Sequence, residues 1–280
     1  MFAADLLAEQ RILVTGGGTG LGLAMATRFA ELGASLVLCG RRTEVLTGAA
    51  NALRERFATS VSTETCDLRD PEAVERMFDR IWTEGSLDVL VNNAAATFIA
   101  QTERLSSRAV DAILAPTLHG AAYCTVAAGR RWIDAGRSGT VLSILSTSVR
   151  TGRAFTVPSA MAKSAIQAMT RSLAVEWGPR GIRLVAIAPG AFPTEATRRQ
   201  LMPAGRQTGD PTIRRVPAGR SGNPSELADL AAFLISGGAS YINGETIAID
   251  GGAHLRTSGV EDLIGWSDAQ WQALRTQRAS

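Results

Sequence analysis

The chain has 280 residues, of which 45% are hydrophobic and 20% are charged, and its formal net charge at pH 7 is +3. A chain of this length can bury the core of one large domain. The small net charge, with no basic block interleaved with aromatic residues, predicts no nucleic-acid partner. No apolar run reaches the roughly 18 residues of a membrane helix and the N-terminus lacks the pattern of a signal peptide, so we expect no membrane partner either.

The cysteines indicate the redox environment of the protein. Cys39, Cys66 and Cys124 are odd in number and contain no C-x-x-C pair, so they predict neither a disulfide framework nor a zinc site. We therefore expect no bound metal. Unpaired cysteines are typical of a reducing compartment, which predicts a cytoplasmic protein.

Short apolar segments alternate along the chain with amphipathic helical segments. This alternation is typical of a parallel sheet covered by helices on both faces. It predicts an α/β fold with a doubly wound parallel sheet of about seven strands in a single domain, residues 1–253, followed by a C-terminal extension, residues 254–280. The predicted strands are Arg11–Thr15, Ser35–Cys39, Val61–Thr65, Leu87–Asn92, Thr140–Ile144, Ile182–Ile187 and Thr246–Ile249.

A glycine-rich segment, Thr15 to Gly22, joins the first predicted strand to the first predicted helix. Glycines at such a turn let the backbone approach a pyrophosphate group, and the N-terminus of the following helix attracts its negative charge. The segment therefore predicts a dinucleotide site. Its predicted cofactor-binding residues are Gly16, Gly18, Thr19, Gly20, Leu21 and Gly22.

Two arginines, Arg41 and Arg42, follow the second predicted strand. An acidic residue at this place would bind the 2′-hydroxyl of an adenosine ribose, whereas a guanidinium group binds the 2′-phosphate of NADP. The pair therefore favours NADP. The alternative is that one or both arginines are solvated loop charges.

Polar residues also follow the next two predicted strands. Asp67 comes after the third strand, and Asn92, Asn93, Ala94 and Ala95 come at the end of the fourth. Taken alone, Asp and Asn in loops are more often turn-forming residues. Because the ends of parallel strands meet at one edge of the sheet, we expect these residues to lie beside the dinucleotide.

The helices carry recognisable start signals. Asp70-Pro71 and Asn223-Pro224 each place a capping side chain before a proline in the first turn. Two long helices are predicted over Arg108–Asp134 and Pro158–Gly178. The segment 190–222 is rich in Pro, Gly, Arg and Thr without helical or strand periodicity, so we interpret it as a loop over the substrate site.

The second long helix carries Lys163, the only lysine in the sequence, since the other 28 of its 29 basic residues are arginines. Ser159 lies four residues earlier, which is about one turn of helix. A single retained ammonium group argues for a specific role rather than for a chance surface position.

Together these segments resemble the short-chain dehydrogenase/reductase family from about Gln10 to Gly252. The matching motifs are Thr15-Gly-x-x-x-Gly-x-Gly22, Asn92-Asn93-Ala94-Ala95, Ser146, Lys163, Pro189-Gly190 and Asp250-Gly251-Gly252. The resemblance implies a Rossmann-like fold, a homotetramer, and NADP contacts that include Leu68, Lys163, Pro189 and Gly190. Ser159 stands where this family usually has a catalytic tyrosine, and a serine hydroxyl is a far weaker acid than a phenol.

Four further segments resemble the 2,4-dienoyl-CoA reductase branch of that family: Asn92–Ile99, Thr102–Ser106, Val157–Lys163 and Tyr241–Gly244. The resemblance implies NADPH-dependent reduction of a 2,4-dienoyl-CoA or another unsaturated acyl-CoA thioester in fatty acid β-oxidation. In that branch a Tyr and an Asn hold the thioester carbonyl. Carried over to this sequence, these positions are Ser148 and His119, so both expected side chains are absent.

The sequence leaves several catalytic candidates in place of the tyrosine. Lys163 can bind the nicotinamide ribose and supply positive charge, and Ser146 and Ser159 can hold a water that relays a proton. His119 can donate a hydrogen bond or a proton, although a lone histidine on a helix is more often a packing or subunit-contact residue. We expect neither tyrosine of the chain, Tyr123 or Tyr241, to be the acid.

Two alternatives to a dienoyl-CoA reductase remain open from the sequence. One is a reductase or dehydrogenase of another carbonyl substrate. The other is a dinucleotide-binding protein without catalytic activity, which the missing tyrosine suggests and the retained Lys163 argues against.

Overall fold

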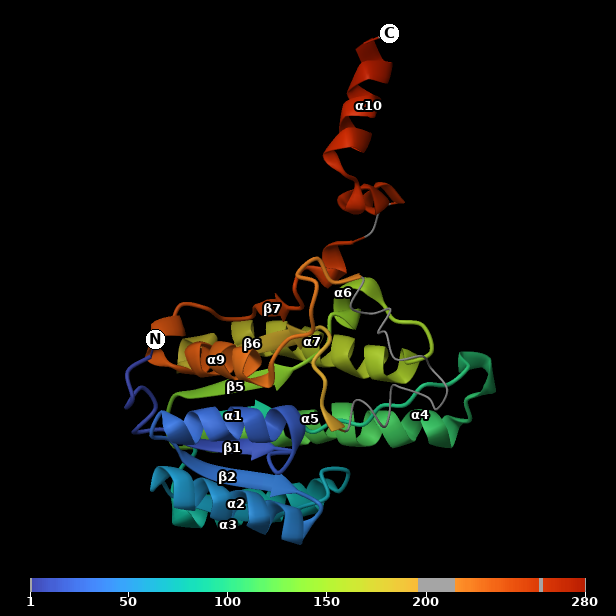
Figure 1. The fold of residues 1–280 in the computed structure, drawn as a ribbon. Helices are drawn as coiled ribbons and strands as arrows, with labels where there is room; N and C mark the ends of the chain where they lie inside the picture. Colours follow the sequence, from blue (N-terminus) through green and yellow to red (C-terminus); the bar gives the residue numbers. More distant parts are fainter. Residues whose placement is uncertain (1, 196–214, 257–258, 280) are drawn as a thin grey trace.

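In the computed structural model, which describes residues 2–195, 215–256 and 259–279, seven parallel strands form one sheet (Figure 1). The strand order is β3-β2-β1-β4-β5-β6-β7, and the predicted α/β class is confirmed. All seven predicted strands are present, with small shifts at their ends. Their bounds are Arg11–Thr15 (β1), Ser35–Gly40 (β2), Val61–Thr65 (β3), Val89–Asn92 (β4), Gly139–Ile144 (β5), Ile182–Pro189 (β6) and Thr246–Ile249 (β7).

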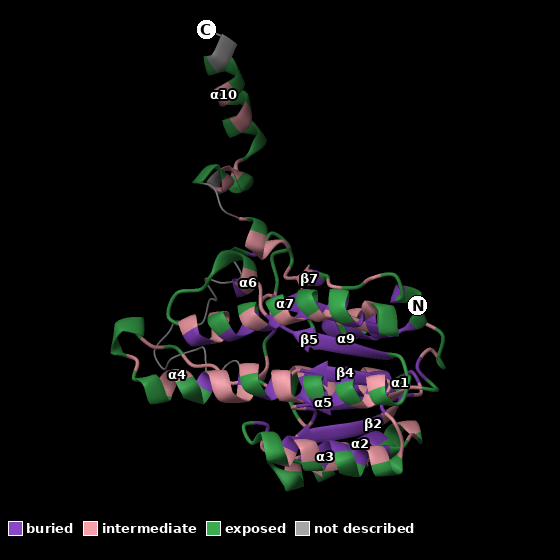
Figure 2. Ribbon diagram, turned by 180° about the vertical axis from the view of Figure 1, so that it is seen from behind, coloured by how far each residue is buried: buried purple, intermediate pink, exposed green. Residues whose placement is uncertain are grey.

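Helices cover both faces of the sheet, as the two opposite views in Figures 1 and 2 show. One apolar core packs α1, α2 and α9 against the sheet, and a second packs α3, α5 and α7 against its other face. The central strands are buried because both faces are covered, which explains their nearly continuous apolar sequence. The α-helices are Gly20–Glu31 (α1), Thr43–Phe57 (α2), Pro71–Glu84 (α3), Ser107–Leu114 (α4), Gly120–Asp134 (α5), Ser148–Thr151 (α6), Val157–Trp177 (α7), Pro224–Ile235 (α9) and Asp268–Ala279 (α10).

Both predicted helix starts are present. The Asp70 carboxylate accepts hydrogen bonds from the backbone N–H groups of Glu72 and Ala73, at 2.9 and 3.1 Å. At the start of α9, the Glu226 carboxylate accepts one from the backbone N–H of Asn223 at 2.7 Å. These bonds satisfy N–H groups that have no partner inside the helix.

The first predicted long helix, Arg108–Asp134, is interrupted. A π-helical turn, Ala115–His119, separates α4 from α5, and it contains Pro116, which has no N–H to donate to the helix ladder. The buried Thr117 hydroxyl accepts a hydrogen bond from the backbone N–H of Ala96 at 3.0 Å. The turn thus attaches the segment after β4 to the helix. Such turns are frequent at functional sites.

The predicted substrate loop, residues 190–222, lies partly outside the described residues, which include only its two ends. In the C-terminal extension, the short helical turn Gly259–Gly265 precedes α10. Figure 1 shows α10 extending away from the sheet. In this arrangement α10 does not cover the edge of the sheet at which the substrate is expected.

Two findings concern the environment of the protein. Cys39, Cys66 and Cys124 are all buried and free, which confirms that they form no disulfide framework. Across residues 2–195, 215–256 and 259–279, no helix combines the length and the apolar character needed to cross a membrane.

Candidate active site

A cavity of about 540 Å³ opens at the C-terminal ends of the strands, where the loops after β1 to β6 converge. In parallel α/β sheets this edge is the usual ligand site. The structure brings nearly all predicted site residues to it. Those that line the cavity are Gly16, Gly18, Thr19, Gly20, Leu21, Arg41, Arg42, Asp67, Leu68, Asn93, Ala94, Ala95, Ser146, Ser148, Ser159, Lys163, Pro189 and Gly190.

The glycine-rich turn leaves a helix N-terminus open to this cavity. Gly16 and Gly20 have φ angles of +66° and +57°, which L side chains rarely adopt. Thr19 precedes α1 without forming a side-chain capping bond, and the first turn of α1 contains no acidic residue. The first N–H groups of α1 and its positive dipole end can therefore meet a phosphate. This arrangement fits the pyrophosphate of a dinucleotide.

Gly22 differs from its predicted role, because it does not line the cavity. A Cβ atom on Gly22 would lie 2.2 Å from the carbonyl oxygen of Gly16. The residue is therefore needed for close packing between α1 and the turn, rather than for contact with the cofactor.

A hydrogen-bond network fixes the turn against the end of β4. The Asn93 side-chain amide donates to the carbonyl oxygens of Thr15 and Gly16, at 2.9 and 3.3 Å. The Thr15 hydroxyl accepts from the backbone N–H groups of Asn93 and Ala94, at 3.0 and 3.1 Å, and donates to the carbonyl of Val91. Asn93 thus lines the cavity but uses its amide to position the turn.

The opposite end of the cavity is basic. Arg41 and Arg42 both line it with exposed side chains. Asp67, the acidic residue nearby, forms an ion pair with Arg69, with Nε at 2.9 and 3.0 Å from the two carboxylate oxygens. This hydrogen bonding lowers the pKa of the Asp67 carboxyl. Among the described residues Asp67 is the only acidic residue that lines the cavity, and this pairing offsets its charge, so an added phosphate would meet a net positive field.

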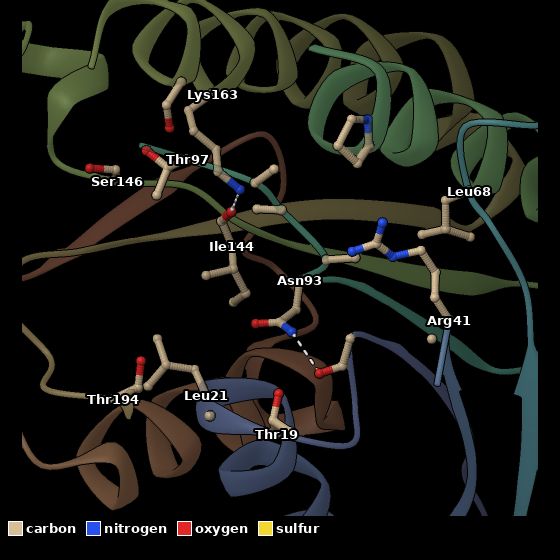
Figure 3. Close-up of a pocket in the computed structure, with 18 of the residues that line it drawn as sticks. Thr19, Leu21, Arg41, Leu68, Asn93, Thr97, Ile144, Ser146, Lys163 and Thr194 are labelled. Atoms are coloured by element: carbon tan, nitrogen blue, oxygen red, sulfur yellow. Dashed lines mark hydrogen bonds between the residues drawn. The ribbon is translucent and has the colours of Figure 1, made fainter. Parts of the chain in front are cut away.

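Lys163 is buried in the first half of α7, with 6% of its surface exposed. Its ammonium group donates a hydrogen bond of 2.5 Å to the carbonyl oxygen of Ile144, the last residue of β5. Figure 3 shows Lys163 above this strand end, close to Ser146 and Thr97. Burial lowers the pKa of Lys163 to about 8, because an apolar environment disfavours the charged form.

Hydroxyl groups surround the Lys163 end of the cavity. Ser146, Ser148 and Ser159 all line it, and the backbone N–H of Ser148 donates to the Ser146 oxygen at 3.3 Å. Thr97, which has no predicted role, also lines it. Its position five residues after β4, at the edge where the strands end, is the signal that could have indicated it. The cluster offers several hydroxyl donors beside one ammonium group.

The other predicted donor, His119, lies elsewhere. The His119 side chain is exposed and is absent from the cavity lining, and its ring centroid is 6.1 Å from that of Tyr123. This position argues against the predicted hydrogen bond between His119 and a substrate, because an exposed side chain outside the cavity lining does not face a ligand bound there. Tyr123 and Tyr241, the only tyrosines, also do not line the cavity.

Fold and cavity together define an α/β protein with a dinucleotide site at the edge of its sheet. A family model described as enoyl-(acyl carrier protein) reductase matches residues 16–254. The chain belongs to the short-chain dehydrogenase/reductase family, whose members are oxidoreductases that bind a nicotinamide dinucleotide.

Several relatives of known name are similar to the chain. The probable 2,4-dienoyl-CoA reductase 3, (3E)-enoyl-CoA-producing, of Caenorhabditis elegans is 40% identical over 267 residues, covering 92% of this chain and 86% of the relative. A probable 2,4-dienoyl-CoA reductase, (2E)-enoyl-CoA-producing, of Bacillus subtilis (strain 168) is 39% identical over 249 residues, covering 88% and 97%. A crystal structure of a gluconate 5-dehydrogenase from Burkholderia cenocepacia in complex with NADP and tartrate superimposes with a TM-score of 0.84 at 30% identity, covering 91% and 99%.

The depressed pKa of Lys163 can be measured directly, because the chain has no other lysine. In a sample labelled with ¹³C at the lysine side chain, we expect one resonance that titrates with a midpoint near pH 8 in the cofactor-free protein. The same signal in urea-unfolded protein should titrate near the ordinary lysine value, roughly 10.4. A native midpoint at or above that value would contradict the described burial of the ammonium group.

Proposed function

We propose that the protein is an NADPH-dependent reductase of conjugated acyl-CoA thioesters, with a 2,4-dienoyl-CoA as the representative substrate. The observation that carries this proposal is the chemistry of the group around Lys163: one ammonium group and several hydroxyl groups line the cavity, and neither tyrosine does. The names of the dienoyl-CoA reductase relatives support the same substrate class. Ser159 stands at the position of the family's usual tyrosine.

The proposed reaction follows from which atom must receive a proton. NADPH supplies a hydride to a carbon of the substrate. In reduction of a simple ketone the carbonyl oxygen becomes an alcohol, so an acid near the oxygen must transfer a proton to it. In reduction of a conjugated thioester the negative charge moves to the carbonyl oxygen only transiently, and a carbon of the chain finally takes a proton from a water that Ser146 and Ser159 can hold. Hydrogen-bond donors and a nearby positive charge are sufficient at the oxygen.

The residues of the cavity fit these needs. Lys163 is an ammonium group at pH 7 because its pKa is about 8, and it places a positive charge at the end of β5. The Ser146 oxygen accepts from the backbone N–H of Ser148, which leaves the Ser146 O–H free to donate to a substrate oxygen. Ser159 and Thr97 are further hydroxyl donors on the same wall. Ser148 is mainly a positioning residue for Ser146.

The cofactor end of the cavity supports NADPH rather than NADH. The guanidinium groups of Arg41 and Arg42 lie where the adenosine ribose of a dinucleotide is expected after β2, and they suit a 2′-phosphate. NADP is also the cofactor named with the similar gluconate 5-dehydrogenase structure.

A second candidate function is dehydrogenation or reduction of a carbonyl substrate. It is favoured by the close superposition on a gluconate 5-dehydrogenase. It would require an acid other than the two tyrosines near the substrate oxygen. The third possibility, a non-catalytic dinucleotide-binding protein, agrees less well with a cavity that keeps Lys163 buried beside Ser146.

Turnover of 2,4-hexadienoyl-CoA with NADPH tests the proposed function. We expect Lys163→Ala to lower kcat/KM at least about a hundredfold, because the positive charge at the substrate oxygen is lost. In the wild type, kcat/KM should fall as the pH rises through about 8, when the ammonium group loses its proton. The control is His119→Ala, which changes an exposed side chain outside the cavity and should retain activity. Turnover of a ketone panel with no turnover of the thioester would contradict the proposal.

Replacing both arginines after β2 tests the cofactor assignment. We expect Arg41→Ala/Arg42→Ala to raise the KM for NADPH by about tenfold to a hundredfold, since a charge-assisted phosphate contact is lost. The KM for NADH, which has no 2′-phosphate, should change little. Equal KM values for the two cofactors in the wild type would show that these arginines are solvated loop charges.

A further inference from the structure

One arginine lines the cavity without an evident task in cofactor binding. Of the four arginines that line the cavity in the described part of the chain, Arg69 is paired with Asp67, and Arg41 and Arg42 lie at the adenosine end of the dinucleotide site. The fourth, Arg153, comes from the segment between α6 and α7. Its side chain is exposed, and no residue of the described chain forms a hydrogen bond or ion pair with its guanidinium group.

The same segment presents an exposed aromatic ring in a strained conformation. Phe155 has a φ angle of +63°, a value that bulky residues rarely adopt, and 57% of its surface is exposed. Its carbonyl oxygen accepts a hydrogen bond of 3.0 Å from the backbone N–H of Ala100, on the segment after β4. Backbone strain of this kind is concentrated at ligand sites. Here the hydrogen bond joins two segments that each contribute residues to the cavity lining: Arg153 and Thr156 from one, and Thr97 from the other.

The position of this segment relative to Lys163 is suited to a long substrate. Ser159 lies one helical turn before Lys163 on α7, and Thr156 and Arg153 follow in the direction away from it. All four residues line the same cavity. A thioester whose carbonyl lies at Lys163 can therefore extend its carrier group past Ser159 and Thr156 to Arg153.

We propose that the segment 152–156 binds the nucleotide of coenzyme A, with the Arg153 guanidinium group on a phosphate and the Phe155 ring against the adenine. This inference rests on the proposed function, since it concerns the carrier of the same thioester. Arginine forms paired, charge-assisted hydrogen bonds with phosphate, and an exposed aromatic ring stacks on a base. The 4′-phosphopantetheine of an acyl carrier protein has a phosphate but no base, so the aromatic ring favours coenzyme A.

A comparison of two thioesters with the same acyl group distinguishes binding of the carrier group from the chemical step. The probes are 2,4-hexadienoyl-CoA and 2,4-hexadienoyl-N-acetylcysteamine, which has neither phosphate nor base. We expect Arg153→Ala to raise the KM for the CoA thioester about tenfold and the KM for the N-acetylcysteamine thioester less than about twofold. Arg153→Lys should recover part of the loss, because it keeps the charge. Phe155→Ala should raise only the KM for the CoA thioester, by about fivefold.

The matched control is Arg171→Ala, which removes an exposed arginine of α7 that does not line the cavity. It should leave the ratio of the two KM values unchanged. Thermal unfolding of each variant shows whether the fold is intact. If Arg153→Ala changes both KM values equally, or neither of them, the nucleotide site is overturned while the proposed function stands.

Direct measurement of coenzyme A binding tests the proposed nucleotide site even if the protein shows no turnover. Free coenzyme A, titrated calorimetrically into the protein with NADP present, should bind about tenfold more weakly to Arg153→Ala than to the wild type. If neither thioester is reduced but this difference is found, the nucleotide site stands and the proposed function falls. If coenzyme A binds equally to both proteins, or to neither, the nucleotide site is overturned.

Discussion

The ammonium group of Lys163 donates a hydrogen bond to the carbonyl oxygen of Ile144, and this contact connects α7 to the C-terminal end of β5. Burial of the charged ammonium group lowers the stability of the folded protein. The unfolded chain holds the proton up to the ordinary lysine pKa of 10.5, whereas the native protein holds it only to about 8. Between these values the unfolded state binds more protons, so this residue's contribution to the free energy of unfolding rises with pH and is least favourable below about pH 8. A charge retained under such a penalty indicates use in binding or chemistry.

The cavity around this charge is assembled from loops that belong to different strands. The hydrogen bonds of Thr15 and Asn93 hold the glycine-rich turn against the end of β4. Thr117 attaches the segment after β4 to the π-helical turn. Both sets of hydrogen bonds fix the same stretch of chain, residues 92–97. Residues 93–97 line the cavity together with the glycine-rich turn and Lys163, so these bonds help to fix the relative positions of the two ligands, as hydride transfer requires.

The sequence predicted the elements whose signal is local. The strands, the helix starts at Asp70 and Asn223, and the glycine-rich turn follow from periodicity, capping and glycine spacing, so they could be recognised without a partner in space. Gly22 was assigned to the cofactor because the motif contains it, although its position is set by the close approach of Gly16. His119 was assigned to the site by its position in a motif. A helical sequence interrupted by Pro116 does not indicate which face of the helix meets the cavity, so the sequence could not show that His119 lies outside it.

Other features depend on tertiary contacts and have little or no signal in the sequence. The irregular segments of the chain contain Thr97, Arg153 and Phe155. These segments lack the helix or strand periodicity from which the direction of a side chain can be predicted. The positive φ angle of Phe155 cannot be expected from its residue type, because it is fixed by the hydrogen bond with Ala100. The residues that the structure adds to the candidate site therefore lie in loops, where local sequence patterns do not indicate tertiary contacts.

In the proposed reaction, hydride reaches a carbon of a conjugated chain while the thioester carbonyl is retained. The most direct measurement uses NADPH deuterated at the transferred position of its nicotinamide and 2,4-hexadienoyl-CoA, with the product analysed by mass spectrometry and NMR. The expected product is an enoyl-CoA with one deuterium on a carbon of the former diene and an intact thioester. Absence of deuterium from the chain of any conjugated thioester, together with deuterium on the carbinol carbon of a reduced ketone, would contradict it.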